Sequence, residues 1–190
     1  MALPTLSIVI ASTRPGRVGR TVGDWFTERA RQHGGFEVKV VDLAEVRLPF
    51  LDEPRHPRFR QYEHEHTKRW SETIGASDAF VFVTPEYDYS MPATLLNALQ
   101  FLSVEWHYKA CGFVSYGGVS AGTRSVQMAK QVVTALKMMP MAEGVFIPFV
   151  PKELKDGVYP GSKTQEDAAK VMLDELGRWT SALAVLRKPA

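Results

Sequence analysis

The chain has 190 residues, of which 45% are hydrophobic and 23% are charged, as in an ordinary globular protein of one domain. Its 23 basic and 21 acidic residues give a net charge of +2 and form no basic run, which argues against a nucleic-acid partner. The sequence lacks both the roughly 18-residue apolar stretch of a membrane span and the basic start of a signal peptide. We therefore expect one domain over residues 1–190, in the cytoplasm and without a membrane partner.

Short apolar runs alternate along the chain with segments of helical periodicity. The apolar runs predict strands at residues 6–11, 36–42, 79–84, 110–115 and 144–148. The periodic segments predict helices at residues 22–33, 60–77, 93–101, 123–138 and 163–186. Residues 43–58 and 151–162, which are rich in proline or glycine, are predicted to be loops.

The strand–helix unit occurs five times, which favours an α/β protein with a parallel sheet. We predict a three-layer, doubly wound, five-stranded sheet of order 2-1-3-4-5. In such a sheet ligands bind outside the carboxyl ends of the strands, at the point where the strand order reverses. The loops after the predicted strands are therefore the first place to look for a site.

The loop after the first strand has the composition of an anion site. Ser12, Arg14 and Arg17 precede Gly19 near the start of a helix, where free backbone N–H groups favour a phosphate. An ordinary polar loop with a capping serine explains the same residues equally well. The loop lacks the glycine–lysine pattern of a nucleoside triphosphatase and the G-x-G-x-x-G pattern of a dinucleotide-binding domain.

The next two loops suit a flat aromatic ligand. Tyr87 and Tyr89 follow the third strand and can stack on a ring, although partly buried loop aromatics would look the same. Gly117 and Gly118 follow the fourth strand and let the backbone approach a ligand, although a tight turn would also need them. Taken together, the three loops describe a site for a flat, phosphorylated ligand such as flavin mononucleotide (FMN).

Read together, these loops resemble those of the NADPH-dependent FMN reductase family. The resemblance rests on Ser12-Thr13-Arg14, on residues 85–92 with Leu96-Asn97-Ala98, and on residues 115–118. It implies a flavodoxin-like fold, bound FMN, NADPH as co-substrate and a homodimer or tetramer. It also implies a small-molecule electron acceptor, such as a flavin, quinone or azo compound, reduced by a ping-pong mechanism.

The resemblance assigns the cofactor-binding residues in three groups. It places Ser12, Arg14 and Gly19 at the phosphate, where Arg17 is a further candidate, and Pro85, Glu86, Tyr87, Asp88 and Tyr89 at the ribityl chain and ring, with Ser115, Gly117 and Gly118 along the ring. Many members have asparagine at the position of Asp88. The chemistry would belong to the cofactor, so we assign no catalytic acid or base.

Other interpretations compete with this one. A flavodoxin-like electron carrier is disfavoured by the nearly neutral charge, and a non-enzymatic interaction domain is disfavoured by the intact loops. His64 and His66 are two residues apart and do not share a helix face, so we predict no metal site. Cys111 is expected to be a small buried apolar residue rather than a reactive thiol. Trp106 fits a dimer interface and the core equally well.

Overall fold

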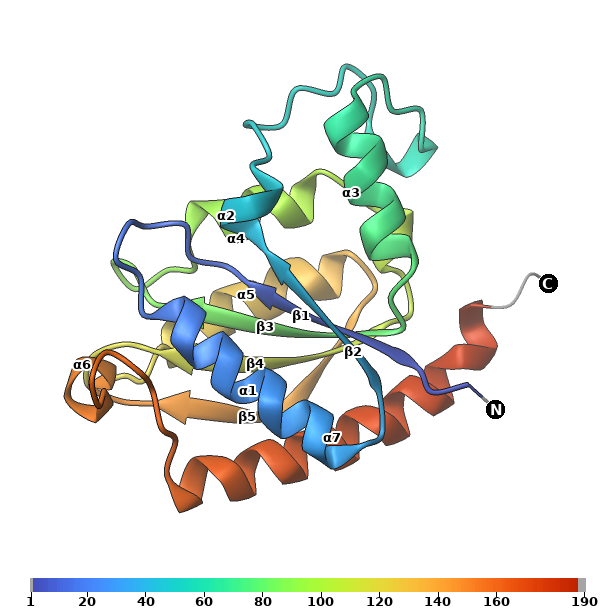
Figure 1. Ribbon diagram of the computed structural model, residues 1–190. Coiled ribbons are helices and arrows are strands. Elements are labelled where there is room, and N and C mark those ends of the chain that lie inside the picture. Colours follow the sequence, from blue (N-terminus) through green and yellow to red (C-terminus); the bar gives the residue numbers. More distant parts are fainter. Residues whose placement is uncertain (1, 188–190) are drawn as a thin grey trace.

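The computed structural model describes residues 2–187 and is built around a five-stranded parallel sheet (Figure 1). Its strands are β1 (Thr5–Ile10), β2 (Glu37–Asp42), β3 (Ala79–Pro85), β4 (Ala110–Tyr116) and β5 (Met139–Ile147). They are ordered β2-β1-β3-β4-β5, which confirms the predicted topology. The order reverses between β1 and β3, so the loops after these two strands diverge to opposite faces and leave a crevice between them.

Helices cover both faces of this sheet. The helices are α1 (Gly19–His33), α2 (Leu43–Val46), α3 (Glu65–Gly75), α4 (Ala93–Gln100), α5 (Thr123–Ala135), α6 (Val150–Glu153) and α7 (Lys163–Leu183). Short 3₁₀ turns lie at Pro57–Phe59, Val104–Trp106 and Ala184–Arg187. Helices α1 and α7 pack on one face, and α3, α4 and α5 pack on the other, which confirms the three-layer arrangement (Figure 1).

Each face of the sheet has its own apolar core. Strands β1, β3 and β4 are buried along their whole length, which explains why their sequences are continuous apolar runs rather than alternating ones. Trp106 belongs to the core beneath α3, where its ring meets Phe80 edge-on with 5.0 Å between centroids. Its Nε1 donates to the carbonyl of Leu99 at 3.1 Å. Cys111 lies in β4 with no exposed surface, and burial raises the pKa of its thiol.

The structure corrects several predicted boundaries. Helix α2 occupies the start of the predicted loop 43–58, because the Asp42 carboxylate caps it by accepting from the Ala44 backbone N–H at 3.0 Å. Helix α6 similarly falls at the predicted loop 151–162, and begins with a proline in its first turn. Helix α3 starts at Glu65 rather than residue 60, and β5 starts at Met139 rather than residue 144.

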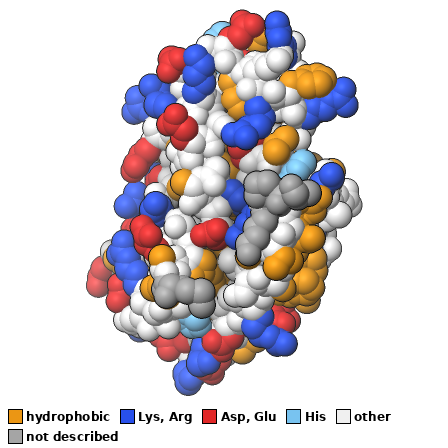
Figure 2. Space-filling view, turned by 90° about the vertical axis from the view of Figure 1, so that its right-hand side faces the viewer, with side chains coloured by type: hydrophobic (Ala, Val, Ile, Leu, Met, Phe, Trp, Pro, Cys, Tyr) orange, Lys and Arg blue, Asp and Glu red, His pale blue; other side chains and the backbone are white. Residues whose placement is uncertain are grey.

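The surface carries charges of both signs. Figure 2 views the molecule from the side on which both chain ends lie, and shows acidic and basic side chains interspersed over that face. This distribution fits a chain whose positive and negative residues nearly balance. Among the helices of residues 2–187, none combines the length and the apolar character needed to cross a membrane.

Candidate functional site

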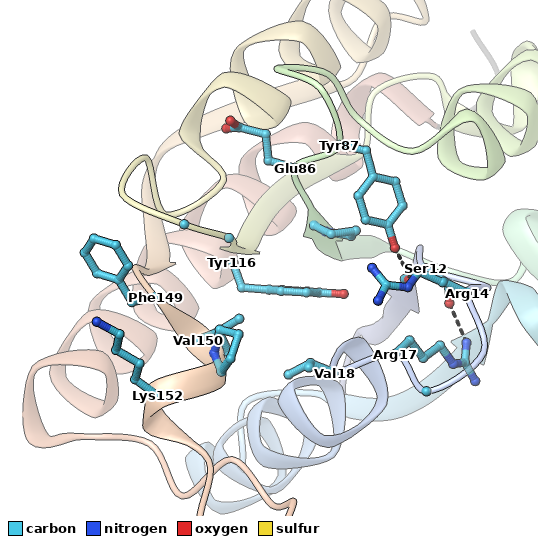
Figure 3. Close-up of a pocket in the computed structure, with 15 residues that line it drawn as sticks. Ser12, Arg14, Arg17, Val18, Glu86, Tyr87, Tyr116, Phe149, Val150 and Lys152 are labelled. Atoms are coloured by element: carbon cyan, nitrogen blue, oxygen red, sulfur yellow. Dashed lines mark hydrogen bonds between the residues drawn. The ribbon is translucent and has the colours of Figure 1, made fainter.

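A cavity of about 400 Å³ opens at the carboxyl edge of the sheet, where the loops after β1, β3, β4 and β5 meet. Its lining comprises Ser12, Arg14, Gly16, Arg17, Val18, Pro85, Glu86, Tyr87, Tyr116, Gly117, Gly118, Phe149, Val150, Pro151 and Lys152. Four residues of the predicted site are absent from this lining, namely Gly19, Asp88, Tyr89 and Ser115. Figure 3 shows Ser12 and Arg14 at one end of the cavity, Phe149 and Lys152 at the other, and Tyr116 between them.

The first loop separates the roles of its two arginines. Arg17 places both terminal nitrogens on the Asp42 carboxylate, at 2.6 and 2.7 Å, and also donates to the Ser12 carbonyl at 2.5 Å. Among residues 2–187, Arg14 takes part in none of the ion pairs, and it lines the cavity. A guanidinium already paired this way has little left for a phosphate, so Arg14 is the better placed of the two.

Asp42 fixes the first loop from the end of β2. Its side chain is 1% exposed. Burial alone would raise the pKa of this carboxyl, but hydrogen bonds from Arg17 and from the Ala44 backbone N–H outweigh it and hold the pKa below its usual value. The pair is therefore charged at neutral pH. Breaking such a buried pair by removing one partner typically costs about 3–5 kcal/mol.

The second loop turns sharply and sends two predicted residues away from the cavity. The backbones of Tyr87 and Ser90 exchange hydrogen bonds of 3.0 and 2.8 Å, and Asp88 and Tyr89 between them have φ values of 49° and 67°. Two central residues of positive φ define a type I′ turn. Tyr89 is 70% exposed, and the guanidinium carbon of Arg124 lies 3.7 Å from its ring centroid.

Glu86 ties the second loop to the third. Its carboxylate accepts from Ser120 Oγ at 2.9 Å and from Arg124 Nε at 2.6 Å. Burial would raise the pKa of Glu86, but these hydrogen bonds prevail and lower it. At the opposite side of the same loop, Tyr87 shares a 2.7 Å hydrogen bond between its hydroxyl and the fully buried Ser12 Oγ. The loops after β1, β3 and β4 therefore form one connected rim.

The third loop presents bare backbone to the cavity. A Cβ atom on Gly118 would meet nothing within 4 Å, whereas one on Gly117 would lie 3.3 Å from the Gly122 nitrogen. Ser115 is buried beneath the loop and donates from Oγ to the Ala121 carbonyl at 2.8 Å. Gly19 also lies behind the cavity wall, where a Cβ would collide with the Tyr116 hydroxyl. Ser115 and Gly19 therefore shape the site without lining it.

Tyr116 is a cavity residue that the sequence analysis did not single out. It is 5% exposed, and within residues 2–187 its hydroxyl has no hydrogen-bond partner. Burial raises the pKa of this phenol and outweighs the opposing influence of the nearby Ser12 hydroxyl, so Tyr116 stays protonated and able to donate. A buried hydroxyl without a partner costs about 1–3 kcal/mol, which a ligand oxygen would recover. The only sequence signal is a tyrosine placed directly before a glycine pair at a strand end.

Phe149 and Lys152 also line the cavity and were not predicted. Phe149 directly follows the predicted strand 144–148, and Lys152 falls in the predicted loop 151–162.

The histidine segment offers no comparable site. His64 and His66 stack with 5.2 Å between ring centroids, and His66 Nε2 lies 2.9 Å from the Asp52 carboxylate. In the part of the chain that the structure describes, no three His, Cys, Asp or Glu side chains are arranged to hold a metal ion.

The fold and its carboxyl-edge cavity define an α/β protein built to bind a mononucleotide. Residues 4–151 match the family model described as NADPH-dependent FMN reductase. Because that match spans most of the chain, the protein belongs to this family. The predictions of an oxidoreductase, of FMN as cofactor and of NAD(P)H as donor are confirmed at the level of the family.

Individual relatives agree with the family match. The chain is 39% identical over 137 residues to an NAD(P)H-dependent FMN reductase of Schizosaccharomyces pombe, covering 71% of this chain and 68% of the relative. It is 28% identical to another NAD(P)H-dependent FMN reductase, from a Nectria species, with 85% of each chain covered. It is also 30% identical to an NAD(P)H:quinone oxidoreductase of Solanum tuberosum, over 73% of each chain.

Solved structures share the fold at low sequence identity. The flavoenzyme NAD(P)H:(acceptor) oxidoreductase FerB of Paracoccus denitrificans superposes with a TM-score of 0.74 at 18% identity, covering 95% of this chain and 98% of that one. A flavodoxin of Streptococcus pneumoniae TIGR4 superposes with a TM-score of 0.59 at 14% identity, covering 92% and 98%. The shared fold thus includes an oxidoreductase and a flavodoxin, so the fold alone does not establish the activity.

The cavity residues fit FMN. Arg14 offers a cation for the phosphate and Tyr116 offers a buried hydroxyl without a partner among residues 2–187. Gly118 leaves open space along the wall, and Tyr87 supplies an aromatic side chain. These are the donors and surfaces that a phosphorylated ring system requires.

Proposed function

We propose that this protein holds one FMN in the carboxyl-edge cavity and uses NADPH to reduce a small-molecule acceptor such as a flavin, a quinone or an azo compound. The observation that carries the proposal is the pair of donors toward one end of the cavity, Arg14 and the Tyr116 hydroxyl, with Phe149 and Lys152 at the opposite, open end and free space beside Gly118 along the wall. A phosphate would lie at the first end and the ring toward the second. The two substrates would use the open end in turn, which gives ping-pong kinetics.

The bound FMN would supply the redox chemistry by accepting a hydride from the nicotinamide and delivering electrons to the acceptor. The chain's own residues bind and orient. Arg14 and Ser12 would hold the phosphate, Gly19 would leave room behind the cavity wall for the Tyr116 hydroxyl, and the pairing of Arg17 with Asp42 keeps that loop in place. Pro85, Glu86 and Tyr87 would border the ribityl chain, and the Gly117–Gly118 backbone would border the ring, supported from below by Ser115.

Asp88 and Tyr89 would act from outside the cavity. Their type I′ turn directs them to the surface beside Arg124, so we propose that they shape the mouth rather than touch the ribityl chain. This role is narrower than the one that the family resemblance implies.

We further propose that residues 1–190 act as one domain, in the cytoplasm, as a homodimer or tetramer. A single cysteine cannot form an intrachain disulfide, which suits a reducing compartment. Phe50 and Phe59 are 84% and 54% exposed, and a second copy of the chain would cover such side chains.

The first test is an absorbance spectrum of the purified protein, followed by anaerobic addition of NADPH in the same cuvette. Flavin bands that bleach with NADPH support the reductase. Flavin that does not bleach supports an electron carrier instead. If the protein carries no flavin and takes up none from added FMN, the proposal is wrong and an interaction domain remains.

A further inference from the structure

We propose that Phe149 and Lys152 form the acceptor-selecting wall of this site and favour flat aromatic acceptors that carry a negative charge on the ring system. This inference rests on the proposed function, because it assigns the open end of the same cavity. Phe149 lies in the turn between β5 and α6 and Lys152 lies in α6, and both line the cavity at the end opposite Arg14 (Figure 3). We call this pair the β5–α6 wall.

The backbone of Phe149 has an unfavourable conformation. Its φ of 46° and ψ of 38° lie in the left-handed region, which is a genuine outlier for a bulky side chain. Burial does not compensate, because Phe149 is 45% exposed. Strain of this kind persists only where the surroundings impose it, and it clusters at functional sites.

Hydrogen bonds to the glycine loop hold this conformation. The Phe149 backbone N–H donates to the Gly118 carbonyl at 3.1 Å, and the Val150 N–H donates to the Gly117 carbonyl at 3.2 Å. The wall is therefore fixed directly to the loop that we assign to the flavin ring. With its backbone held in this way and its side chain 45% exposed, Phe149 offers a stacking surface whose backbone needs no further ordering.

Lys152 places a positive charge over the Phe149 ring. Its backbone N–H donates to the Phe149 carbonyl at 2.8 Å, and its Nζ lies 5.2 Å from the centroid of the Phe149 ring. None of the ion pairs found within residues 2–187 involves Lys152. Because this charge lies next to the stacking surface, the anionic group that it recognises must be attached to the stacked ring system rather than lie at the end of a long chain.

The charge is tested with two naphthoquinones of the same ring size, one neutral (menadione) and one sulfonated (1,2-naphthoquinone-4-sulfonate). For Lys152→Gln we expect KM for the sulfonated quinone to rise about fivefold, the scale of an exposed charge contact, with KM for menadione unchanged. Lys155→Gln is the matched control, because Lys155 is also exposed but does not line the cavity. Equal effects on both quinones, or a rise confined to KM for NADPH, would overturn the role of the charge.

A binding measurement separates recognition from turnover. Naphthalene-2-sulfonate cannot be reduced as a quinone is, and its Kd can be read from the shift that it causes in the flavin spectrum. We expect Kd to rise about fivefold in Lys152→Gln and to stay unchanged in Lys155→Gln. An unchanged Kd in both variants contradicts the proposal.

The strain is tested by Phe149→Gly with Lys137→Gly as its matched control. Lys137 is exposed, has a φ of 55° and lies outside the cavity lining. Relief of the backbone strain should raise Tm by about 2–4 °C in both variants. Only Phe149→Gly should raise KM for both quinones, by tenfold or more by our expectation from lost aromatic stacking of about 1.5 kcal/mol. If Phe149→Gly leaves both KM values unchanged, the wall has no selecting role.

The two proposals fail in different ways. If every variant retains FMN that NADPH bleaches, but none discriminates between the quinones, the reductase stands and the β5–α6 wall is wrong. If the wild-type protein neither holds nor takes up FMN, the proposed function itself is wrong.

Discussion

The two edges of the sheet differ in how particular polar groups are paired. At the amino edge the Thr5 N–H donates to Asp78 at 2.9 Å, and Ser7 and Ser77 share a 2.7 Å bond between hydroxyls. At the carboxyl edge the Tyr116 hydroxyl has no partner among residues 2–187, and Phe149 has a strained backbone. Both edges belong to the same strands, so the sequence at the strand ends decides the difference.

This comparison separates groups that stabilise the folded protein from groups that remain available to bind a ligand. Satisfied groups at the amino edge each add a modest net stabilisation, whereas unsatisfied or strained groups at the carboxyl edge lower stability until a ligand meets them. Substitutions at the amino edge should therefore change Tm but not FMN affinity. Substitutions at the carboxyl edge should change FMN affinity, and those that remove an unsatisfied or strained group should also raise Tm.

The largest effect should come from Gly118→Val. The open space beside Gly118 accepts the new side chain, so we expect Tm to stay within about 2 °C of wild type. The same side chain takes up cavity space, so FMN affinity should fall by about 100-fold or more, as for an overpacked site. Gly75→Val is the control, because a Cβ on Gly75 near the amino edge also meets nothing within 4 Å. Thermal unfolding gives the Tm of the two variants, and isothermal titration gives their affinity for FMN. Full FMN binding by Gly118→Val would place the ring elsewhere.

Arg14→Ala should weaken FMN binding by about 10–100-fold, because a charge-assisted hydrogen bond contributes about 1.5–3 kcal/mol. Riboflavin, which lacks the phosphate, should bind equally well to both proteins. Arg187→Ala removes a cation at the amino edge that pairs with Asp78 at 2.9 Å, and should lower Tm without affecting FMN. An equal loss of riboflavin and FMN affinity in Arg14→Ala would contradict a phosphate role.

At the amino edge, Lys109 should make the free energy of unfolding depend on pH. Its Nζ donates to the Ile74 carbonyl at 2.7 Å, and burial lowers the pKa of Lys109 from 10.5 to about 8. Above about pH 8 the unfolded chain still binds this proton while the folded chain has lost it, so the free energy of unfolding rises with pH. Between about pH 8 and pH 10, wild type should gain about 1–2 kcal/mol relative to Lys109→Met in urea titrations. Parallel pH profiles of the two proteins would show that Lys109 titrates normally.

Tyr116→Phe should have the smallest effect, and the sign of its change in the free energy of unfolding is informative. Removing a buried hydroxyl without a partner should raise the free energy of unfolding of the apo-protein by about 1 kcal/mol, and weaken FMN binding about fivefold. Tyr62→Phe is the contrast, because the Tyr62 hydroxyl donates to Glu105 at 2.9 Å and its loss should destabilise the protein without affecting FMN. Destabilisation by Tyr116→Phe would mean that its hydroxyl is satisfied.

The sequence predicts the buried strands well and the marginal elements poorly. Strands β1, β3 and β4 are apolar throughout because both faces are covered, so their ends are visible to within about one residue. Strand β5 lies at the edge and mixes buried with exposed residues, so its first part shows no clear pattern. Helices α2 and α6 have four residues each, too few to show a helical period.

The positions of the loops around the cavity could be predicted from the strand ends. The contacts of individual side chains could not be predicted where the partner lies far away in the sequence. The loops follow from the strand positions alone. The engagement of Arg17 depends on Asp42, which lies 25 residues away in the chain, so nothing in the loop itself indicates it. The outward turn at Asp88 and Tyr89 is equally hidden, because type I′ turns usually have Asn-Gly and this one does not.

Cys111 has a consequence for the durability of the enzyme. Reduced flavins that meet molecular oxygen release peroxide, and peroxide attacks thiolates that it can reach. The protein has a single cysteine, which is fully buried in β4 and whose thiol pKa is raised by burial. Its only thiol is thus shielded from the oxidant that its own turnover would generate, and long operation in air should leave it unmodified.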